Sequence, residues 1–265
     1  MGSEWIPPEV DGQRPSVARV YDFLLGGDHN FVSDRELATG LLRVEPQARE
    51  LALANRAFLR RAVRVAAEAG VRQFVDIGSG IPTQGNVHEV AQGVDPSARV
   101  VYVDNDDVAV AHSRVILTGN DRATVLRADM RRPAGILADP ALRGLLDLSE
   151  PVAFLLVAAL HLLTDADDPG AVVATLRDAC APGSHLVISH ITHEARPGKA
   201  AAIGKLYDRA SSPAVSRSHE EILRFFDGWD LLDPGLVYVP LWRPDDGESV
   251  AEPERFLMLG GTARR

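Results

Sequence analysis

The stretch QFVDIGSG at residues 73–80 decides the fold that this sequence predicts. Phe74, Val75 and Ile77 belong to a short apolar run typical of a buried strand, and a Gly-Ser-Gly turn follows it directly. Glycine permits positive φ angles and lets the backbone pass close to a ligand. Taken alone, the motif fits a plain strand-to-helix turn, a dinucleotide site or another nucleoside site.

Strand-like and helix-like segments alternate along the rest of this region. Such alternation predicts an α/β fold with a mostly parallel, doubly wound sheet, in which ligands bind at the carboxyl ends of the strands. Segment 152–158 is apolar on both faces, as a central parallel strand requires. The predicted strands are 71–76, 99–104, 123–128, 152–158 and 184–191, and the predicted helices are 83–91, 106–117 and 169–180.

The two ends of the chain extend this core. Apolar spacing before residue 71 predicts three helices: one that opens at Pro15 and stops at Gly26, a short one after Ser33, and one from about 46 to 69. We therefore expect residues 1–70 to form an N-terminal helical extension or lid. Residues 71–265 form the expected core, with one or two helices in 198–226 and late strands at 237–240 and 256–261 that pair as an antiparallel hairpin. Both parts are expected to make one compact domain.

Acidic residues stand at the ends of the first three predicted strands: Asp76, Asp104 and Asp129. Asp104 can accept hydrogen bonds from both hydroxyls of a ribose, while Asp106 or Asn105 caps the next helix. Asp129 can accept from an adenine amino group, with Met130 packing on the ring. Each aspartate alone could be an ordinary loop residue, but three in order predict one shared cleft.

A dinucleotide site expects a third glycine at the start of the helix, facing a pyrophosphate. The sequence has IPT at 81–83 instead, which favours a ligand without a pyrophosphate. A nicotinamide oxidoreductase is therefore disfavoured.

With these features the sequence resembles an actinobacterial family of S-adenosylmethionine-dependent methyltransferases that was long catalogued as a domain of unknown function. The resemblance extends from about residue 14 to 261. It rests on RPSVARVYDFLLGGDHNF at 14–31, NRAFLRRAV at 55–63, QFVDIGSGIPTQGNVHEVAQ at 73–92, RVVYVDNDDVAVAHSR at 99–114, RADMRRP at 127–133 and WRP at 242–244.

The resemblance implies a Rossmann-like methyltransferase fold, S-adenosyl-L-methionine as cofactor and transfer of its methyl group to an unidentified small molecule. A non-catalytic module that binds the cofactor for regulation or structure is the alternative. The family pattern places Gly78, Gly80, Asp104 and Asp129 on the cofactor. The other cofactor contacts that we expect are Asp76, Ser79, Asn105, Met130 and Val157.

No catalytic residue stands out, because holding the reactants in line can suffice for methyl transfer. The segment 21–30 is the first candidate for a lid, with Tyr21 toward the sulfonium, although a glycine-capped packing helix fits equally. Asn55 is expected to orient the loop at 26–27 or to reach the cofactor. His161 could act as a base, but a packing role is favoured. VAA at 157–159 replaces the acidic or Asn residue usual after the fourth strand, which argues against methylation of DNA amino groups.

The overall composition limits the classes of partner and the cellular location that we expect. The formal net charge of −9 disfavours DNA and RNA as substrates. The single cysteine, Cys180, excludes an internal disulfide and fits a reducing cytoplasm, and neither a signal peptide nor a membrane span is expected. His190 and His193 lack a matching ligand set, so no metal is expected. An Arg-rich, Lys-poor composition suggests a bacterial source, and a homodimer is one assembly that the sequence allows.

Overall fold

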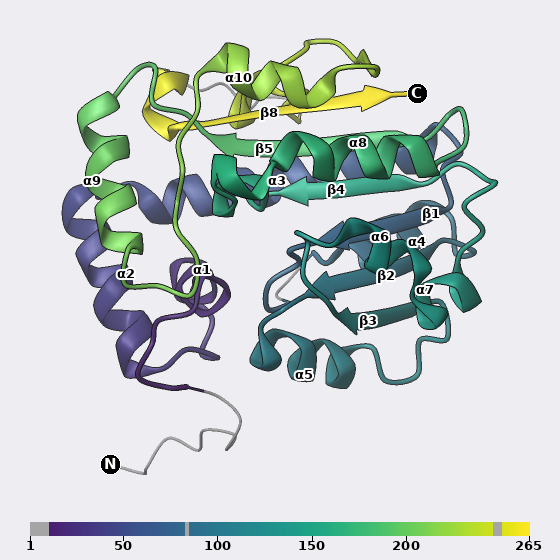
Figure 1. Cartoon of the computed structure of the whole chain (residues 1–265), viewed down its shortest axis with the longest axis horizontal. Coiled ribbons are helices and arrows are strands. Elements are labelled where there is room, and N and C mark those ends of the chain that lie inside the picture. The colour runs from purple at the N-terminus through teal and green to yellow at the C-terminus, as the bar shows by residue number, and fades with distance from the viewer. Residues whose placement is uncertain (1–10, 83–84, 246–250) are drawn as a thin grey trace.

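Five parallel strands form the centre of the sheet in the computed structural model, which describes residues 11–82, 85–245 and 251–265. The strand order is β3-β2-β1-β4-β5-β8-β6, and β7 also pairs with β8 (Figure 1). The strands β8, β6 and β7 are antiparallel to their partners, so the parallel core carries an antiparallel edge. The strand bounds are β1 Gln73–Ile77, β2 Arg99–Asp104, β3 Ala123–Arg127, β4 Ala153–Val157, β5 His185–Ile191, β6 Asp230–Leu231, β7 Val237–Tyr238 and β8 Met258–Arg264.

The central strands are buried on both faces because their side chains alternate between two apolar clusters. In β4, Phe154 and Leu156 belong to the cluster on one face, whereas Ala153 and Leu155 belong to the other. This double burial explains why the strand sequence AFLLV is uninterrupted by polar residues.

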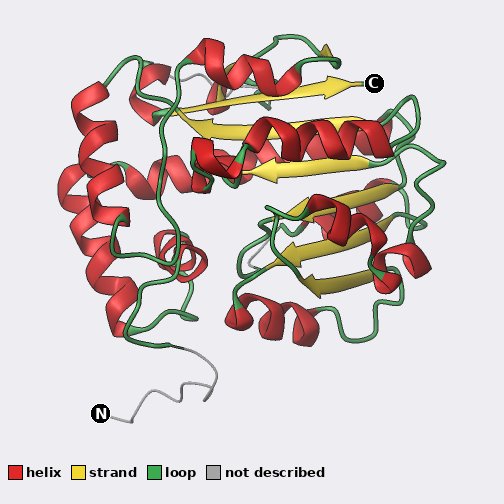
Figure 2. Cartoon of the chain, viewed as in Figure 1, coloured by secondary structure: helices red, strands yellow, loops and turns green. Residues whose placement is uncertain are grey.

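Helices cover the two faces of the sheet (Figure 2). One cluster includes apolar residues of α6, α7, α8 and α10, and the other includes residues of α3, α4 and α5. Their bounds are α3 Ala48–Glu68, α4 Val87–Val94, α5 Asp107–Ile116, α6 Pro133–Ala138, α7 Pro140–Leu145, α8 Pro169–Ala179 and α10 His219–Leu223. Among the described residues, no helix combines the length and the apolar character needed to cross a bilayer.

A second layer lies beside the carboxyl ends of the strands (Figure 1). It consists of α1 (Val17–Leu24), α2 (Val32–Val44), α9 (Pro197–Tyr207) and the first half of α3. Leu24, Leu41, Ala52 and Ile203 share a smaller apolar cluster there, separate from the two clusters of the sheet. The helix α3 links both parts, because Phe58 in its second half packs into the core of the sheet.

Most predicted elements are present, with shifted ends. The helix expected after Ser33 begins at Val32 and extends to Val44, and the helix expected at 83–91 spans Val87–Val94, with residues 83–84 outside the described ranges. The late strands pair with each other as predicted, but β8 also joins the main sheet beside β5. The elements α6, α7 and β6 were not predicted from the sequence.

The position of β8 explains its glycine-rich sequence. A Cβ atom on Gly260 would lie 2.9 Å from the Phe58 ring of α3 and 2.9 Å from Val239. Glycine weakens the sequence signal for a strand, yet here it lets a buried strand pass beneath α3 and the residues after β7.

Candidate active site

A large cavity opens at the carboxyl ends of β1, β2 and β4 and continues beneath α1, α3 and α9. The volume open to the centres of water-sized molecules is about 150 Å³. Residues of the glycine turn and of the loops after β2 and β4 line one part. The other part is lined by helical residues and by Leu257 and Met258. We call this second part the acceptor chamber; it is bounded by Leu24, Leu41, Glu45, Ala48, Ile203, Tyr207 and Leu257.

The glycine turn is held against the end of β2. Gly78 and Gly80 have φ angles of +73° and +66°, in the region that favours glycine. The backbone N–H groups of Gly78 and Ser79 both donate to the carbonyl of Val103, at 2.8 and 3.2 Å. A Cβ atom on Gly78 would lie 2.9 Å from that of Ala159, so the turn is pressed against the loop after β4.

Asp104 is buried at the end of β2 with its carboxylate in the cavity. Its Oδ2 accepts from the Gly80 N–H at 2.7 Å, and its Oδ1 accepts from the Asp106 N–H at 2.8 Å. A carboxylate offers about four acceptor sites, so room remains for two ligand hydroxyls. Burial raises the pKa of Asp104 to about 6, although the backbone donors oppose the shift.

Asp76 faces the same cavity from β1 and accepts no hydrogen bond from another described residue. Burial raises the pKa of this carboxyl group to about 7; the positive charge of Arg56 lowers it and the negative charge of Asp104 raises it. The turn also contains Ser79, whose buried Oγ has no hydrogen-bond partner in the described part of the chain. These unsatisfied acceptors beside an open backbone cradle fit a ligand with hydroxyl and ammonium groups.

The remaining predicted contacts divide into two groups. Asn105, Met130 and Val157 line the cavity, as do the two glycines and Ser79. Asp129 differs from the expectation, because its carboxylate lies outside this lining and is bound by the Arg131 guanidinium at 2.6–3.0 Å. Arg131 lies only two residues away, so this local ion pair competes with a ligand for the carboxylate.

Asn55 connects the helical layer to the sheet. Its Nδ2 donates to the Tyr21 hydroxyl at 2.9 Å, and its Oδ1 accepts from the Ser189 hydroxyl at 2.6 Å. Ser189 in turn accepts from the N–H of Ala158, a non-glycine residue with a φ of +56°. Asn55 therefore bridges α1 and β5, and in this structure it does not bond to the loop at 26–27, contrary to one of the two expected roles.

The histidines after β4 and on β5 lie edge to face, with their ring centroids 5.6 Å apart. His190 Nδ1 donates to the Ile191 carbonyl, and Arg217 donates to its Nε2 at 3.0 Å. His161 lines the cavity, and its Nδ1 has no partner among the described residues, so it is not the satisfied packing histidine that we expected. Burial and the charge of Arg217 lower the pKa of His161 to about 3, which makes it a weak base. Within the described ranges, no group of three His, Cys, Asp or Glu could hold a metal.

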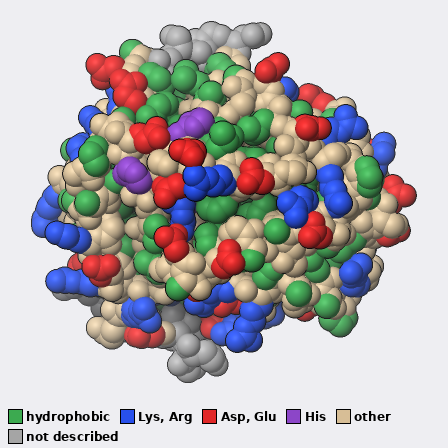
Figure 3. All heavy atoms as spheres, turned by 45° about the horizontal axis from the view of Figure 1, so that its top comes forward, with side chains coloured by type: hydrophobic (Ala, Val, Ile, Leu, Met, Phe, Trp, Pro, Cys, Tyr) green, Lys and Arg blue, Asp and Glu red, His purple; other side chains and the backbone are tan. Residues whose placement is uncertain are grey.

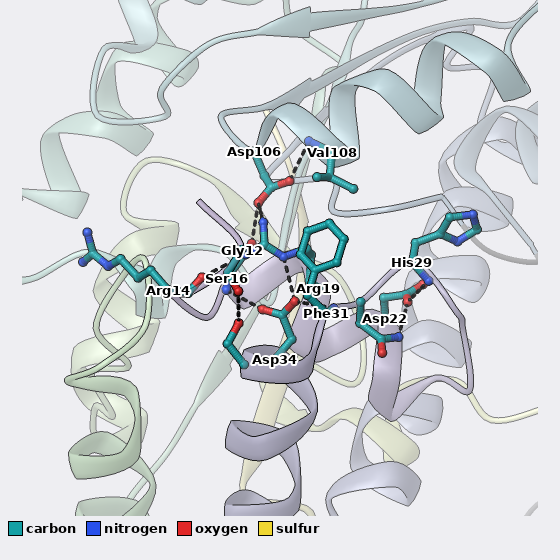
Figure 4. A network of polar contacts seen from close by, with 12 residues as sticks. Gly12, Arg14, Ser16, Arg19, Asp22, His29, Phe31, Asp34, Asp106 and Val108 are labelled. Atoms are coloured by element: carbon teal, nitrogen blue, oxygen red, sulfur yellow. Dashed lines mark hydrogen bonds and ion pairs between the residues drawn. The ribbon is translucent and has the colours of Figure 1, made fainter. Parts of the chain in front are cut away.

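A buried polar network that the sequence did not predict joins the helical layer to the cavity wall (Figure 4). Asp34 of α2 accepts from Arg19 Nε and from the N–H of Ser16, both at 2.8 Å. Arg19 and the Ser16 hydroxyl also reach Asp106, the N-cap of α5. We call these four residues the polar latch. Its hydrogen bonds and ion pairs join residues 15 to 90 positions apart, so no local pattern could have revealed it.

Comparisons with known proteins agree with this architecture. A family profile described as S-adenosyl methyltransferase matches residues 3–265. A methyltransferase candidate from Thermobifida fusca YX is 41% identical, with a TM-score of 0.93 over 99% of each chain. A DUF574 family protein from Streptomyces avermitilis MA-4680 is 39% identical, with a TM-score of 0.91 over 96% of this chain and 99% of that chain. None of the curated proteins matches this chain. The chain therefore belongs to the S-adenosyl methyltransferase family, and it is an S-adenosylmethionine-dependent methyltransferase with a Rossmann-like fold.

Proposed function

We propose that this methyltransferase holds its cofactor at the glycine turn and methylates a small molecule that enters the acceptor chamber. The observation that carries the proposal is the continuity of one cavity from the strand ends to the chamber beneath the helices. When bound, S-adenosylmethionine supplies an electrophilic methyl group on a positively charged sulfur.

The described residues fit the parts of that cofactor. The Asp104 carboxylate, held by Gly80 and Asp106, is placed to accept from the ribose hydroxyls. We assign the cofactor ammonium to Asp76, the buried carboxylate on β1. Asn105, Met130 and Val157 line the cavity; we assign the first two to the adenine, and Val157 to the methionine side with the glycine turn. Asp129 would reach the adenine amino group only after releasing Arg131.

The residues of this chain act mainly by positioning. Holding a nucleophile in line with a methyl carbon can supply roughly 7–11 kcal/mol of the barrier. The strand ends hold the cofactor. The hydrogen bonds from Asn55 to Tyr21 and from Ser189 to Asn55 hold the helical wall that faces it. We assign no general base, because the weakly basic His161 is unsuited to that role.

Gly78→Ala is expected to weaken binding of S-adenosylhomocysteine about tenfold. The substitution places a side chain at a positive φ, which costs about 1–2 kcal/mol, and brings a Cβ against Ala159. Isothermal titration calorimetry measures the affinity. Gly93→Ala in α4 is the control, because open space surrounds that position and alanine favours the helix. Equal affinities of the two variants would contradict the proposed role of the turn.

Cofactor binding is expected to release protons near neutral pH. The pKa values of about 7 for Asp76 and about 6 for Asp104 leave both carboxyl groups partly protonated there in the free protein. The ligand favours the ionised forms and so lowers both pKa values, and its affinity should rise as the pH increases through about 6 to 7. Calorimetry in two buffers of different ionisation enthalpy measures the release, and Asp76→Asn should reduce it. Heats that do not depend on the buffer would contradict this assignment.

The same shifts predict the sign of the stability change in the free protein. Both folded-state pKa values lie above that of an unfolded aspartate, so the folded chain binds more protons between about pH 4 and 7. The stability contributed by these two groups is present below about pH 4 and is lost as the pH rises through the folded pKa values. Bound cofactor should remove much of this dependence.

We propose a small molecule and not a nucleic acid as the acceptor. The net charge of −9 opposes a phosphate backbone. On the face in Figure 3, acidic and basic side chains are interspersed and form no broad basic surface. We further propose that the reaction takes place in the cytoplasm of a bacterium, in keeping with the free Cys180 and with the sources of the two similar structures. The exposed large apolar residues, among them Val32, Leu53 and Val115, are spread over several helices, and we propose no homodimer.

Methyl-labelled cofactor tests the proposal directly. The protein is incubated with the labelled cofactor and a bacterial extract, which is then separated into small molecules, nucleic acid and protein. We expect label in the small-molecule fraction, and we expect Asp104→Asn to abolish it. Label found only in nucleic acid or protein would refute a small-molecule acceptor.

A further inference from the structure

The acceptor chamber is chiefly apolar. Leu24, Leu41, Ile203 and Leu257 belong to the apolar cluster of the helical layer and line the chamber. An occupant that buries its surface against these side chains gains about 25 cal/mol for each Å² of apolar area. The body of the acceptor is therefore apolar, and its polar groups are few.

The carboxylates that line the cavity are already paired or are assigned to the cofactor. None of those described is left to pair with a cationic acceptor. Glu45 is almost fully buried at the chamber wall, where it pairs with Lys199 at 2.8 Å and with Arg196 at 3.4 Å. Asp106 belongs to the polar latch, and our assignment commits Asp76 and Asp104 to the cofactor. An ammonium group in the chamber would stay unpaired and would be costly to bury.

The electrostatic field in the cavity also disfavours a cation. Arg56 lines the cavity, and its charge lowers the pKa values of both Tyr21 and Asp76 against the effect of burial. Arg56 therefore contributes a positive potential at both side chains, which Asp104 opposes at Asp76. The sulfonium of the bound cofactor would add to the positive contribution of Arg56, and both charges oppose an ammonium and favour an oxyanion near them.

A tyrosine in the chamber wall can meet a polar group of the acceptor. The Tyr21 hydroxyl already donates to the Ala52 carbonyl and accepts from Asn55. Tyr207 also lines the chamber, and its hydroxyl has no hydrogen bond to another described residue. Burial and nearby Tyr21 raise the pKa of Tyr207 to about 12, so it remains a neutral donor.

We propose that the acceptor is a largely apolar compound with one weakly acidic hydroxyl, of the phenol class, that is anchored by Tyr207 and methylated on oxygen. This inference rests on the proposed function of the cavity. The hydroxyl loses its proton to solvent as the oxyanion is stabilised by the positive field. The oxygen lone pair then forms the bond to the methyl carbon while the carbon–sulfur bond breaks, and that electron pair stays on sulfur as a neutral thioether.

A pair of probes of similar size tests this assignment: 2-naphthol and the cation 2-naphthylmethylammonium. Each is titrated by fluorescence into the full-length protein saturated with S-adenosylhomocysteine. We expect 2-naphthol to bind at least about tenfold more tightly than the ammonium. Tyr207→Phe should weaken naphthol binding about three- to tenfold, as loss of one hydrogen bond predicts. Its affinity for S-adenosylhomocysteine should not change, which shows that the variant is folded.

Tyr238→Phe is the matched control, since Tyr238 lies on β7 outside the cavity lining, and it should bind naphthol like the wild type. Equal affinities for the two probes, tighter binding of the ammonium, no binding of either, or naphthol binding unaffected by Tyr207→Phe would overturn the inference while the proposed function stands. Failure of the wild type to bind S-adenosylhomocysteine would overturn both.

Discussion

Replacing Asp104 with Asn should weaken binding of S-adenosylhomocysteine by about 100-fold or more. The buried carboxylate has two acceptor positions left for ribose hydroxyls after the bonds from Gly80 and Asp106. Hydrogen bonds to charged groups contribute about 1.5–3 kcal/mol each, so weakening two of them costs at least two orders of magnitude in affinity. The asparagine also turns an NH₂ group toward a backbone N–H or a ribose hydroxyl. Titration calorimetry measures the loss, and circular dichroism verifies the fold.

Asp107→Asn provides the control for charge. Asp107 lies three positions away, is partly exposed and pairs with Arg127 at the surface. Its substitution removes the same charge from the nearby first residue of α5, which is outside the cavity lining. We expect less than about a twofold change in affinity, as is usual for an exposed ion pair. A similar loss in both variants would show that net charge, and not the position of Asp104, controls binding.

Among the substitutions proposed for this protein, Asp34→Ala should lower the free energy of unfolding the most. Asp34 is completely buried and accepts from the Ser16 N–H, the Phe31 N–H and Arg19 Nε, each at 2.8 Å. Without it, two backbone donors lose their partner. The buried guanidinium keeps its hydrogen bonds to the carbonyls of Arg14 and Asp11, but its remaining ion pair is the longer contact with Asp106, at 3.4 Å. Breaking a buried ion pair from one side costs about 3–5 kcal/mol. The loss should fall mainly on α1 and α2.

Hydrogen exchange distinguishes this local effect from general unfolding. We expect faster exchange in residues 17–44 of Asp34→Ala, whereas β1 to β5 keep their protection. Asp28→Ala is the control, because Asp28 is 93% exposed in its side chain. Binding of S-adenosylhomocysteine should also weaken, since Ser16 and Asp106 line the cavity next to Asp104. Uniform loss of protection throughout the sheet would show that the helical layer is not an independent unit.

The hydrogen-exchange experiment also tests the predicted division at residue 70. The sequence places residues 1–70 in an extension and 71–265 in a core. In the structure, α3 contributes Ala52 to the helical layer and Phe58 to the core of the sheet. An exchange boundary within α3 would place the division inside this helix and not at its end.

The sequence alone determined the parallel strands and the position of the site. Short apolar runs followed by glycine or aspartate are local patterns, and burial on both faces leaves little choice in the strand sequence. Because parallel strands end at the same edge of a sheet, Asp76 and Asp104 had to meet there, and both line the cavity.

Only the tertiary structure decided what each polar side chain bonds to. Asp129 follows its strand as expected, yet the nearby Arg131 guanidinium occupies its carboxylate. Asn55 bonds to Ser189, 134 positions away, and Arg19 bonds to Asp106, 87 positions away. The acceptor chamber likewise exists only because α9 and the segment before β8 pack against α1 and α3. Such contacts depend on distances between elements remote in the chain, and these distances are fixed only when the helical layer packs against the strand ends.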